Sequence, residues 1–307
     1  MATPLRTAKK LLIGREIAWM IDTTTAFKSE GNERLSHAKA AKLIETSQTR
    51  LTALTNGTGA IAPGDLVMLA NKLGFTDEHY HEVLLELRRD SHKRGSWSTG
   101  YMRAYHEDVR LLVDLERYAD LIRTVEVEIV PGLAQCEAYA RALHEGAVNE
   151  EGITVEEYVQ ARLARQHVLD QDNAPEYRLV LSESCLRREY GGPEVMREQI
   201  EHLIQFSQRR NVFLQVLPFR IKTRRAAHMA NRFVLIRVPS PGRAAPLEMA
   251  YSEADGEIRY MDDQKALAAR TTAWDTLSSN ALNFEDTRLY LTHVSNDWAR
   301  LTRKTSR

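Results

Sequence analysis

Two adjacent stretches near the N-terminus decide how the first part of the chain folds. They are Leu35-Ser36-His37-Ala38-Lys39-Ala40-Ala41-Lys42-Leu43-Ile44 and Ser47-Gln48-Thr49-Arg50-Leu51-Thr52-Ala53-Leu54-Thr55-Asn56-Gly57. Their apolar spacing predicts two short helices joined by a tight turn. Ser47 can accept hydrogen bonds from the free N–H groups at the start of the second helix. Asn56-Gly57 predicts the end of that helix, because glycine tolerates the left-handed conformation found there.

The second of these helices presents polar side chains suited to DNA. Gln48 and Arg50 follow the capping serine, and their amide and guanidinium groups can hydrogen-bond to base edges or phosphates in the major groove. Lys39 and Lys42 in the first helix are candidates for phosphate contacts, although a plain solvated surface explains them equally well. The two helices therefore predict a DNA-reading helix-turn-helix whose partner is double-stranded DNA.

The charge distribution agrees with this hypothesis only locally. The 307-residue chain has 42 basic and 42 acidic residues, so it carries no formal net charge and is not a polybasic coat for nucleic acid. Residues 1–60 hold nine lysine and arginine residues against five acidic residues, a net charge of +4. A modest basic excess around a helix-turn-helix fits phosphate contact, and a solvated surface is the alternative.

Five helices are predicted in the N-terminal part of the chain. They cover 11–27, 35–44, 47–55, 64–73 and 76–89, with a polar loop at 28–34. The apolar stripe of the first helix consists of Leu12, Ile13, Ile17 and Met20. We predict a compact helical DNA-binding domain over residues 1–90, followed by a linker over 91–102 that is rich in polar residues and glycine.

The remaining residues, 103–307, predict an α+β domain for regulation or interaction. Helices are expected over 103–130, 133–146, 154–170, 193–208, 262–281 and 284–300. Short strands rich in Val, Leu, Ile, Phe and Tyr are expected over 177–181, 212–217, 233–238, 247–251 and 258–261, with loops at 220–225 and 239–246. The predicted fold class is therefore mainly α, with an N-terminal five-helix helix-turn-helix module and an α+β C-terminal domain.

Cysteine use and hydropathy indicate where the protein resides. Cys136 and Cys185 are the two cysteines, and they form no CxxC pair, which suits a reducing cytosol. The N-terminus has no apolar signal-peptide core, and no stretch is long enough to span a membrane. We expect a soluble, cytoplasmic protein without a membrane partner.

The residues that could carry chemistry give no positive case for an enzyme. Cys185 lies near Glu183, but no nucleophile motif surrounds it, and a small buried apolar role is expected. His79 and His81 point to different faces of a helix and have no third ligand near them in sequence. No glycine-rich phosphate loop is present. We therefore expect no catalytic residue, no metal and no cofactor, and no effector-binding residue can be named.

Four short motifs occur in a typical order: Leu35-Ser36, Ser47-Gln48, Asn56-Gly57 and Pro63. In this the segment resembles the Cro/repressor-type (XRE-like) helix-turn-helix family, in which a Leu-Ser pair starts the second helix and a Ser-Gln pair starts the third. The resemblance implies that the start of the third helix lies in the DNA groove. The predicted DNA-binding residues are Ser36, Lys39, Ser47, Gln48, Thr49, Arg50 and Thr52.

Further ordered motifs follow in the rest of the chain. They are Val130-Pro131-Gly132-Leu133-Ala134-Gln135, Tyr139-Ala140-Arg141-Ala142-Leu143, Arg162-Leu163-Ala164-Arg165-Gln166, Ser182-Glu183-Ser184-Cys185-Leu186-Arg187, Gly191-Gly192, His202-Leu203, and Asn211-Val212 through Val216-Leu217-Pro218-Phe219. In these motifs the chain resembles the C-terminal domain of actinobacterial XRE-like proteins that are often called antitoxin-like transcriptional regulators. The resemblance implies a DNA-binding regulator and implies little about the biochemical role of this domain.

We interpret the chain as a sequence-specific DNA-binding transcriptional regulator that acts as a homodimer, since a two-fold dimer spans half-sites about 34 Å apart. The helices at 262–281 and 284–300 are expected to hold the dimer. Their apolar positions are Leu267, Trp274, Leu277, Leu282, Leu289 and Leu291, which core packing explains nearly as well. One alternative is an antitoxin-like protein that binds a small partner protein and autoregulates its own operon. Another is a small-molecule-responsive regulator whose effector pocket lies in the α+β domain.

Overall fold

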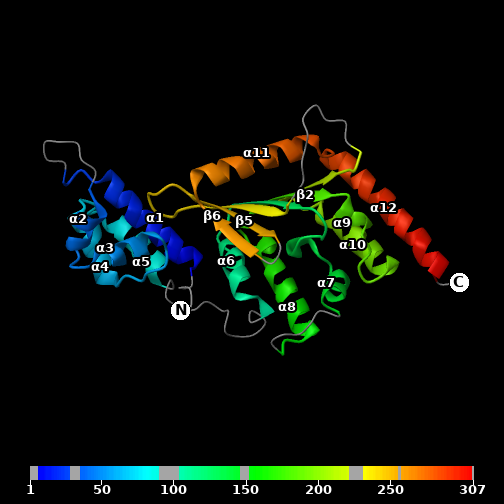
Figure 1. Cartoon of the computed structure of the whole chain (residues 1–307), viewed down its shortest axis with the longest axis horizontal. Helices are drawn as coiled ribbons and strands as arrows, with labels where there is room; N and C mark the ends of the chain where they lie inside the picture. Colours follow the sequence, from blue (N-terminus) through cyan, green and yellow to red (C-terminus); the bar gives the residue numbers. More distant parts are fainter. Residues whose placement is uncertain are drawn as a thin grey trace. The chain divides into compact units, whose positions relative to one another are not determined.

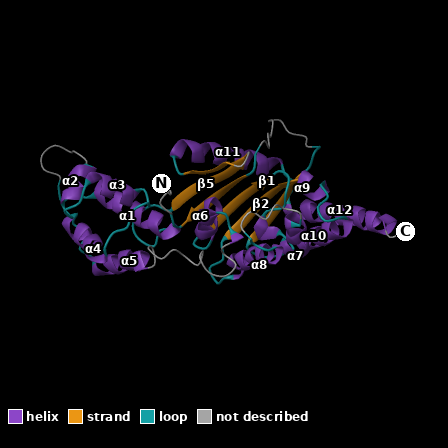
Figure 2. Cartoon of the chain, turned by 60° about the horizontal axis from the view of Figure 1, so that its bottom comes forward, coloured by secondary structure: helices purple, strands orange, loops and turns teal. Residues whose placement is uncertain are grey.

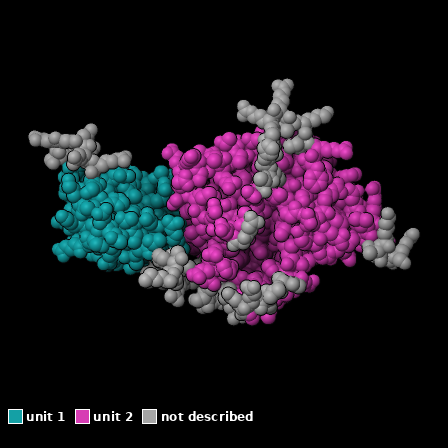
Figure 3. Space-filling model, in the orientation of Figure 1, with its two compact units in different colours: residues 1–95, 238–247 teal, residues 96–237, 248–307 magenta. Residues whose placement is uncertain are grey.

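A computed structural model describes residues 6–27, 35–89, 104–145, 152–220, 231–254 and 257–305. The chain forms two compact units, which Figure 3 colours separately. The first consists of residues 1–95 and 238–247, and the second of residues 96–237 and 248–307. The loop predicted at 28–34 and the linker predicted at 91–102 lie outside the described residues, as does most of the loop predicted at 220–225.

Five helices occupy the described part of residues 6–89 (Figure 1). They are α1 (Ala8–Thr23), α2 (His37–Lys42), α3 (Gln48–Thr55), α4 (Pro63–Lys72) and α5 (Glu78–Arg89). Helix α1 begins before Leu11 because the Thr7 hydroxyl accepts a hydrogen bond from the Lys10 backbone N–H at 3.3 Å. It also ends at Thr23, earlier than the apolar spacing predicts.

The ends of the short helices follow their local chemistry. The hydroxyls of Ser36 and Ser47 accept hydrogen bonds from the backbone N–H groups of Lys39 and Arg50, so both serines cap helices, as predicted for Ser47. Gly57 follows α3 with a φ of 69°, which confirms the predicted left-handed stop. The side chains of the predicted α1 stripe are all buried: Leu12, Ile13, Ile17 and Met20.

The second unit is built on a six-stranded mixed sheet with the order β3-β2-β1-β4-β5-β6. Its strands are β1 (Leu121–Glu126), β2 (Glu176–Ser182), β3 (Val212–Leu217), β4 (Phe233–Val238), β5 (Leu247–Ala254) and β6 (Glu257–Met261). Strand β1 runs parallel to β2, and β2 runs parallel to β3, whereas β1 pairs antiparallel with β4. β1 therefore joins the parallel and antiparallel parts of the sheet.

Helices cover both faces of this sheet (Figures 1 and 2). They are α6 (Glu107–Glu116), α7 (Glu137–His144), α8 (Val155–Gln166), α9 (Ser184–Arg187), α10 (Pro193–Phe206), α11 (Gln264–Asn280) and α12 (Phe284–Thr305), with short 3-10 turns at Gly132–Ala134 and His167–Asp170. On one face, Trp274 and Leu277 of α11 pack in a core with Val125, Val180 and Leu235. Helix α12 packs along α10. Helices α6 and α8 lie on the opposite side of the sheet (Figure 1).

The sequence prediction was wrong for one strand. Residues 103–130 were predicted to be mostly helical, but α6 is the one α-helix in the described part of this range, and Leu121–Glu126 forms β1. Val125 pairs with Val180 of β2 and with Phe233 of β4. Because β1 is covered on both faces, its apolar residues do not alternate cleanly with polar ones, and the periodicity of a half-buried strand is missing. The other five predicted strands are present, and the chain is helix-rich with a mixed sheet.

The segment between β4 and β5 belongs to the first unit, where it surrounds a buried carboxylate. Glu16 of α1 is fully buried. Its carboxylate accepts hydrogen bonds from the Tyr80 hydroxyl at 2.7 Å and from the backbone N–H groups of Arg243 and Ala244, each at 3.0 Å. The Ser240 hydroxyl is a further donor. A buried carboxylate is stable only when donors replace its water, and this segment supplies most of them.

This network changes the domain boundary that the sequence suggested. A fragment limited to residues 1–90 keeps Glu16 and Tyr80 but lacks Ser240, Arg243 and Ala244. The guanidinium of Arg243 also lies 4.7 Å from the centre of the Tyr80 ring. The first unit is therefore completed by residues that come from far along the chain.

We predict that Glu16→Gln lowers the free energy of unfolding of the first unit by about 3 kcal/mol, because the amide nitrogen would face N–H donors and leave at least one unsatisfied. Urea unfolding of the full chain measures the change. Glu82→Gln, at an exposed position on α5, is the matched control and should shift stability by less than about 0.5 kcal/mol. Equal stability of the two variants would contradict the structural role of Glu16.

Candidate functional site

Two regions are candidates for function, one in each unit. The first is the exposed surface at the starts of α2 and α3, which carries the sequence-predicted DNA-binding residues. Ser36, Ser47, Gln48, Thr49 and Arg50 are exposed. Lys39 is also exposed, whereas Thr52 is half-buried. Leu51 and Leu54 on the inner face of α3 are buried, so the apolar side of this helix packs inward and leaves its polar start open to solvent.

The exposed side chains on α2 and α3 are free for a partner. Within the described residues, Gln48, Arg50 and Lys39 make no side-chain hydrogen bond or ion pair. Residues 35–57 contain three lysine and arginine residues and one acidic residue, Glu45. Glu45 lies in the turn between the helices with a φ of 51°, a conformation that is uncommon for residues other than glycine. The turn therefore fixes how α3 follows α2.

The second region is a cavity of about 430 Å³ inside the second unit. Its floor is the sheet face opposite α11, where Thr124 and Glu126 of β1 and Tyr177 of β2 point away from the α11 core. This alternation follows from the two-residue period of a strand. Helices α6 and α8 and the segment around Gly132 line the other side. A volume of this size is typical of sites for small molecules.

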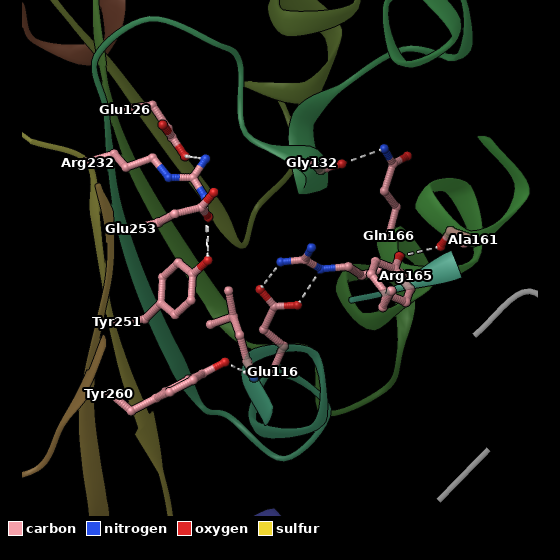
Figure 4. A network of polar contacts seen from close by, with 12 residues as sticks. Glu116, Glu126, Gly132, Ala161, Arg165, Gln166, Arg232, Tyr251, Glu253 and Tyr260 are labelled. Carbon is pink, nitrogen blue, oxygen red and sulfur yellow. Dashed lines mark hydrogen bonds and ion pairs between the residues drawn. The ribbon is translucent and has the colours of Figure 1, made fainter. Parts of the chain in front are cut away.

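The helix side of the cavity is held by a buried ion pair (Figure 4). Arg165 of α8 donates two hydrogen bonds to Glu116 of α6, from Nε at 2.7 Å and from Nη2 at 2.6 Å. Their side chains are only 9% and 2% exposed, so the bidentate geometry has to compensate for lost hydration. The Tyr105 hydroxyl donates to the Ala161 carbonyl at 2.6 Å. These contacts fix α8 against α6.

The strand side carries a second polar group, which Figure 4 shows across from the first. Arg232 precedes β4 and pairs with Glu253 of β5, and its Nη1 lies 3.9 Å from Glu126 Oε1. The Tyr251 hydroxyl donates to Glu253 at 2.6 Å. Burial raises the pKa of Glu126 to about 7, and the positive charge of Arg232 offsets part of this rise. Glu126 is thus a carboxyl that changes charge near neutral pH.

Arg162 is the third arginine of the cavity, and it differs from the other two. Within the described residues, its side chain makes no hydrogen bond or ion pair. Burial, and next the positive charge of Arg165, lower the pKa of the Arg162 guanidinium. The side chain lies over Gly132, where a Cβ would approach Arg162 Cδ to 2.9 Å and would come closer still to Nη1. Gly132 therefore provides the space that the guanidinium occupies.

The remaining wall of the cavity is aromatic and aliphatic. His144 of α7 stacks on Tyr158 of α8, with ring centroids 4.6 Å apart and planes 9° apart. Burial, and then the charge of Arg162, lower the pKa of His144, which favours the neutral imidazole. Val109, Leu133 and Leu143 also line this part of the cavity. The cavity thus combines charged groups with a substantial apolar surface.

Three other residues were considered for chemistry in the sequence: Cys185, His79 and His81. Their surroundings in the structure are as follows. Cys185 is fully buried, which confirms its predicted role as a small apolar residue. Burial raises the pKa of its thiol, so the nucleophilic thiolate is disfavoured. His81 contacts the Phe75 carbonyl at 2.7 Å, and His79 pairs loosely with Glu82. The described part of the chain contains no cluster of three or more His, Cys, Asp and Glu side chains suited to a metal ion.

The sheet and its cavity define the second unit as a mixed α/β domain with an internal polar pocket. Residues 109–293 match the model of a protein family described as a domain of unknown function, DUF5753. The match spans more than half of the chain, and the chain belongs to this family. No curated protein and no solved structure matches it. Helices α1–α5 lie outside the matched residues. Among the helices that the structure describes, none has the length and apolar content needed to cross a membrane.

Sequence reasoning missed the cavity and its charged residues. Arg162 and Arg165 did appear in a family-like motif, and their spacing of three places both on one face of a helix. Tyr251 and Glu253 are two apart on a strand and so share a face. Glu126 could not be recognised, because the segment that contains it was predicted to be helical.

We predict that Glu126 makes the second unit less stable as the pH rises. Its pKa is about 7 in the folded chain and near 4.3 when unfolded, so the unfolded state releases this proton first and stability falls between these pH values by about 4 kcal/mol. Glu126→Gln should remove this component. Urea unfolding of wild type and variant at several pH values measures it, and a difference between them that does not change from pH 4.5 to pH 7.5 would contradict the assignment.

Proposed function

We propose that the chain is a sequence-specific DNA-binding transcriptional regulator, and that α1–α5 form a helix-turn-helix module of the Cro/repressor type. The observation that carries the proposal is the surface at the start of α3. Gln48, Thr49 and Arg50 are exposed directly after the capping Ser47, while Leu51 anchors the helix in the core. A helix start with free amide and guanidinium groups is the arrangement that reads base edges in a major groove.

Charge and geometry support the same proposal. Lys39 lies in the first turn of α2. Its side chain is exposed and makes no ion pair within the described residues. A cation in this place suits phosphate contact, which positions a reading helix without specifying sequence. The Ser36 hydroxyl accepts from the Lys39 backbone N–H, so its own O–H remains available to donate to a phosphate oxygen.

The proposal is tested first by selecting DNA from a random library with the purified full chain. A regulator of this kind should enrich one short motif in two copies, and the affinity for that motif should exceed the affinity for unrelated DNA by a factor of about 10³ or more at fixed salt. Enrichment of no motif, with equal weak binding to all DNA, would reject sequence-specific recognition.

We predict that Arg50→Ala weakens binding to the selected DNA by about 1–3 kcal/mol and relaxes the preference at one base position. Fluorescence anisotropy at matched salt measures both effects. Arg89→Ala is the control, because Arg89 is exposed at the end of α5 and paired with Glu86 at 2.7 Å, and it should leave affinity nearly unchanged. Lys39→Ala should weaken all sequences alike and reduce the salt slope by about 1. An unchanged affinity in Arg50→Ala would argue against this reading surface.

We propose further that the regulator is a homodimer held by α12. Trp274, Leu277 and Leu291 are buried within the second unit, so core packing accounts for them. Leu289, by contrast, is 65% exposed, and Phe284 and Leu301 on the same helix are also exposed. The outer side of α12 therefore offers Leu289 for an apolar contact with a second copy, and this exposed side chain is what supports the proposal.

The expected result is a dimer mass at tens of micromolar in light scattering of the full chain. Leu289→Lys should shift the mass toward a monomer, because a charge would have to be buried in the interface. Gln171→Lys, at an exposed position outside α12, is the control for an added surface charge and should leave the dimer intact. A monomer for the wild type, both free and bound to the selected DNA, would reject the dimer.

A further inference from the structure

We propose that the cavity of the second unit binds a small monocarboxylate with an apolar body, and that Arg162 is the residue that pairs with its carboxylate. The proposal is independent of DNA binding. It rests on three features of the cavity: one arginine that has no hydrogen bond or ion pair among the described residues, two other arginines that are paired with glutamates, and an apolar wall opposite the strands.

Three arginines and three glutamates line the cavity, and one of these arginines makes no hydrogen bond or ion pair with the described residues. Arg165 is satisfied by both oxygens of Glu116, and Arg232 is shared between Glu253 and Glu126. Arg162 has no such partner within the described residues. A guanidinium does not lose its proton in a protein, so its charge in a half-buried site favours an anion that can pair with it.

The surroundings select a singly charged anion. Glu116 lies close enough to act on Arg162 electrostatically, and Glu126 and Glu253 line the same cavity. A dianion such as a phosphate ester would add two negative charges to a cavity whose three arginines already face three glutamates. A carboxylate carries a single charge and matches the guanidinium in a bidentate geometry.

The shape of the cavity indicates the rest of the ligand. The stacked rings of His144 and Tyr158 line the same cavity as Val109 and Leu143, and burial lowers the pKa of His144, which favours its neutral form. This part of the wall therefore favours an aromatic or aliphatic body rather than a second charge. The volume of about 430 Å³ accommodates such a molecule.

Gly132 positions the proposed anion site. A Cβ at this residue would come into close contact with the Arg162 side chain. The backbone around it is held in place, because Gln166 donates to the Gly132 carbonyl at 2.9 Å and to the Gln135 carbonyl at 2.8 Å. The guanidinium is thus placed by packing against a fixed segment and is not neutralised there.

The test uses isothermal titration of the full chain with phenylacetate and hexanoate, each compared with its neutral amide, and with phenyl phosphate as the dianion. Wild type should bind at least one carboxylate, and should bind its amide at least about tenfold more weakly. Arg162→Met should lose at least about tenfold in carboxylate affinity, whereas Arg162→Lys should keep part of it. Arg197→Met on α10, whose guanidinium pairs with Glu201 at 3.1 Å, is the matched control and should bind like wild type.

Thermal unfolding gives a second readout that does not need the natural ligand. Arg162→Met should melt at a higher temperature than wild type without ligand, because it removes an unpaired cation, and phenylacetate should no longer raise its melting temperature. Binding of amides as tight as that of carboxylates would overturn the proposal. So would tighter binding of phenyl phosphate, an unaltered affinity in Arg162→Met, or the absence of carboxylate binding to wild type up to about 10 mM. If Arg162→Met fails to fold, the comparison of carboxylate with amide on the wild type decides.

Discussion

The first unit depends on the burial of one carboxylate. Removing the Glu16 side chain from water costs several kcal/mol unless hydrogen-bond donors replace its hydration. Tyr80 on α5 supplies one donor, and Ser240, Arg243 and Ala244 supply the others. A Cβ on Gly242 would lie 2.7 Å from a carboxylate oxygen of Glu16, so the segment closes tightly around it. This requirement explains why residues 238–247 belong to the first unit and why a single cut in the sequence does not separate two domains.

Local chemistry made much of the fold predictable. Ser36, Ser47 and Gly57 act at helix ends as their residue types indicate, and five of the six strands were found from β-branched and aromatic runs. Strand β1 was missed because both of its faces are covered and Arg123 and Glu126 interrupt its apolar residues. Nothing within such a segment distinguishes strand from helix, since its partners β2 and β4 lie about 55 and 110 residues farther along the chain.

The residues of the first candidate site could be proposed from the sequence, whereas the residues of the cavity could not. The exposed residues of α2 and α3 form one continuous stretch, so motif spacing alone was enough to propose them as a site. The cavity instead brings Glu116 together with Arg165, and Arg232 with Glu253. These pairs become visible only when α6 packs on α8 and β4 lies beside β5. Each charged residue, taken alone in the sequence, is indistinguishable from an ordinary surface residue.

The loop that supplies donors to Glu16 directly joins two strands of the sheet, β4 and β5. Arg232 stands before β4, while Tyr251 and Glu253 lie on β5, and all three line the cavity. The same two strands are joined by the eight residues 239–246, three of which donate to Glu16. The loop is therefore fixed by two separate requirements. Its ends are set by the pairing of β4 and β5 in the sheet, and its middle is set by the donors that the buried Glu16 carboxylate needs.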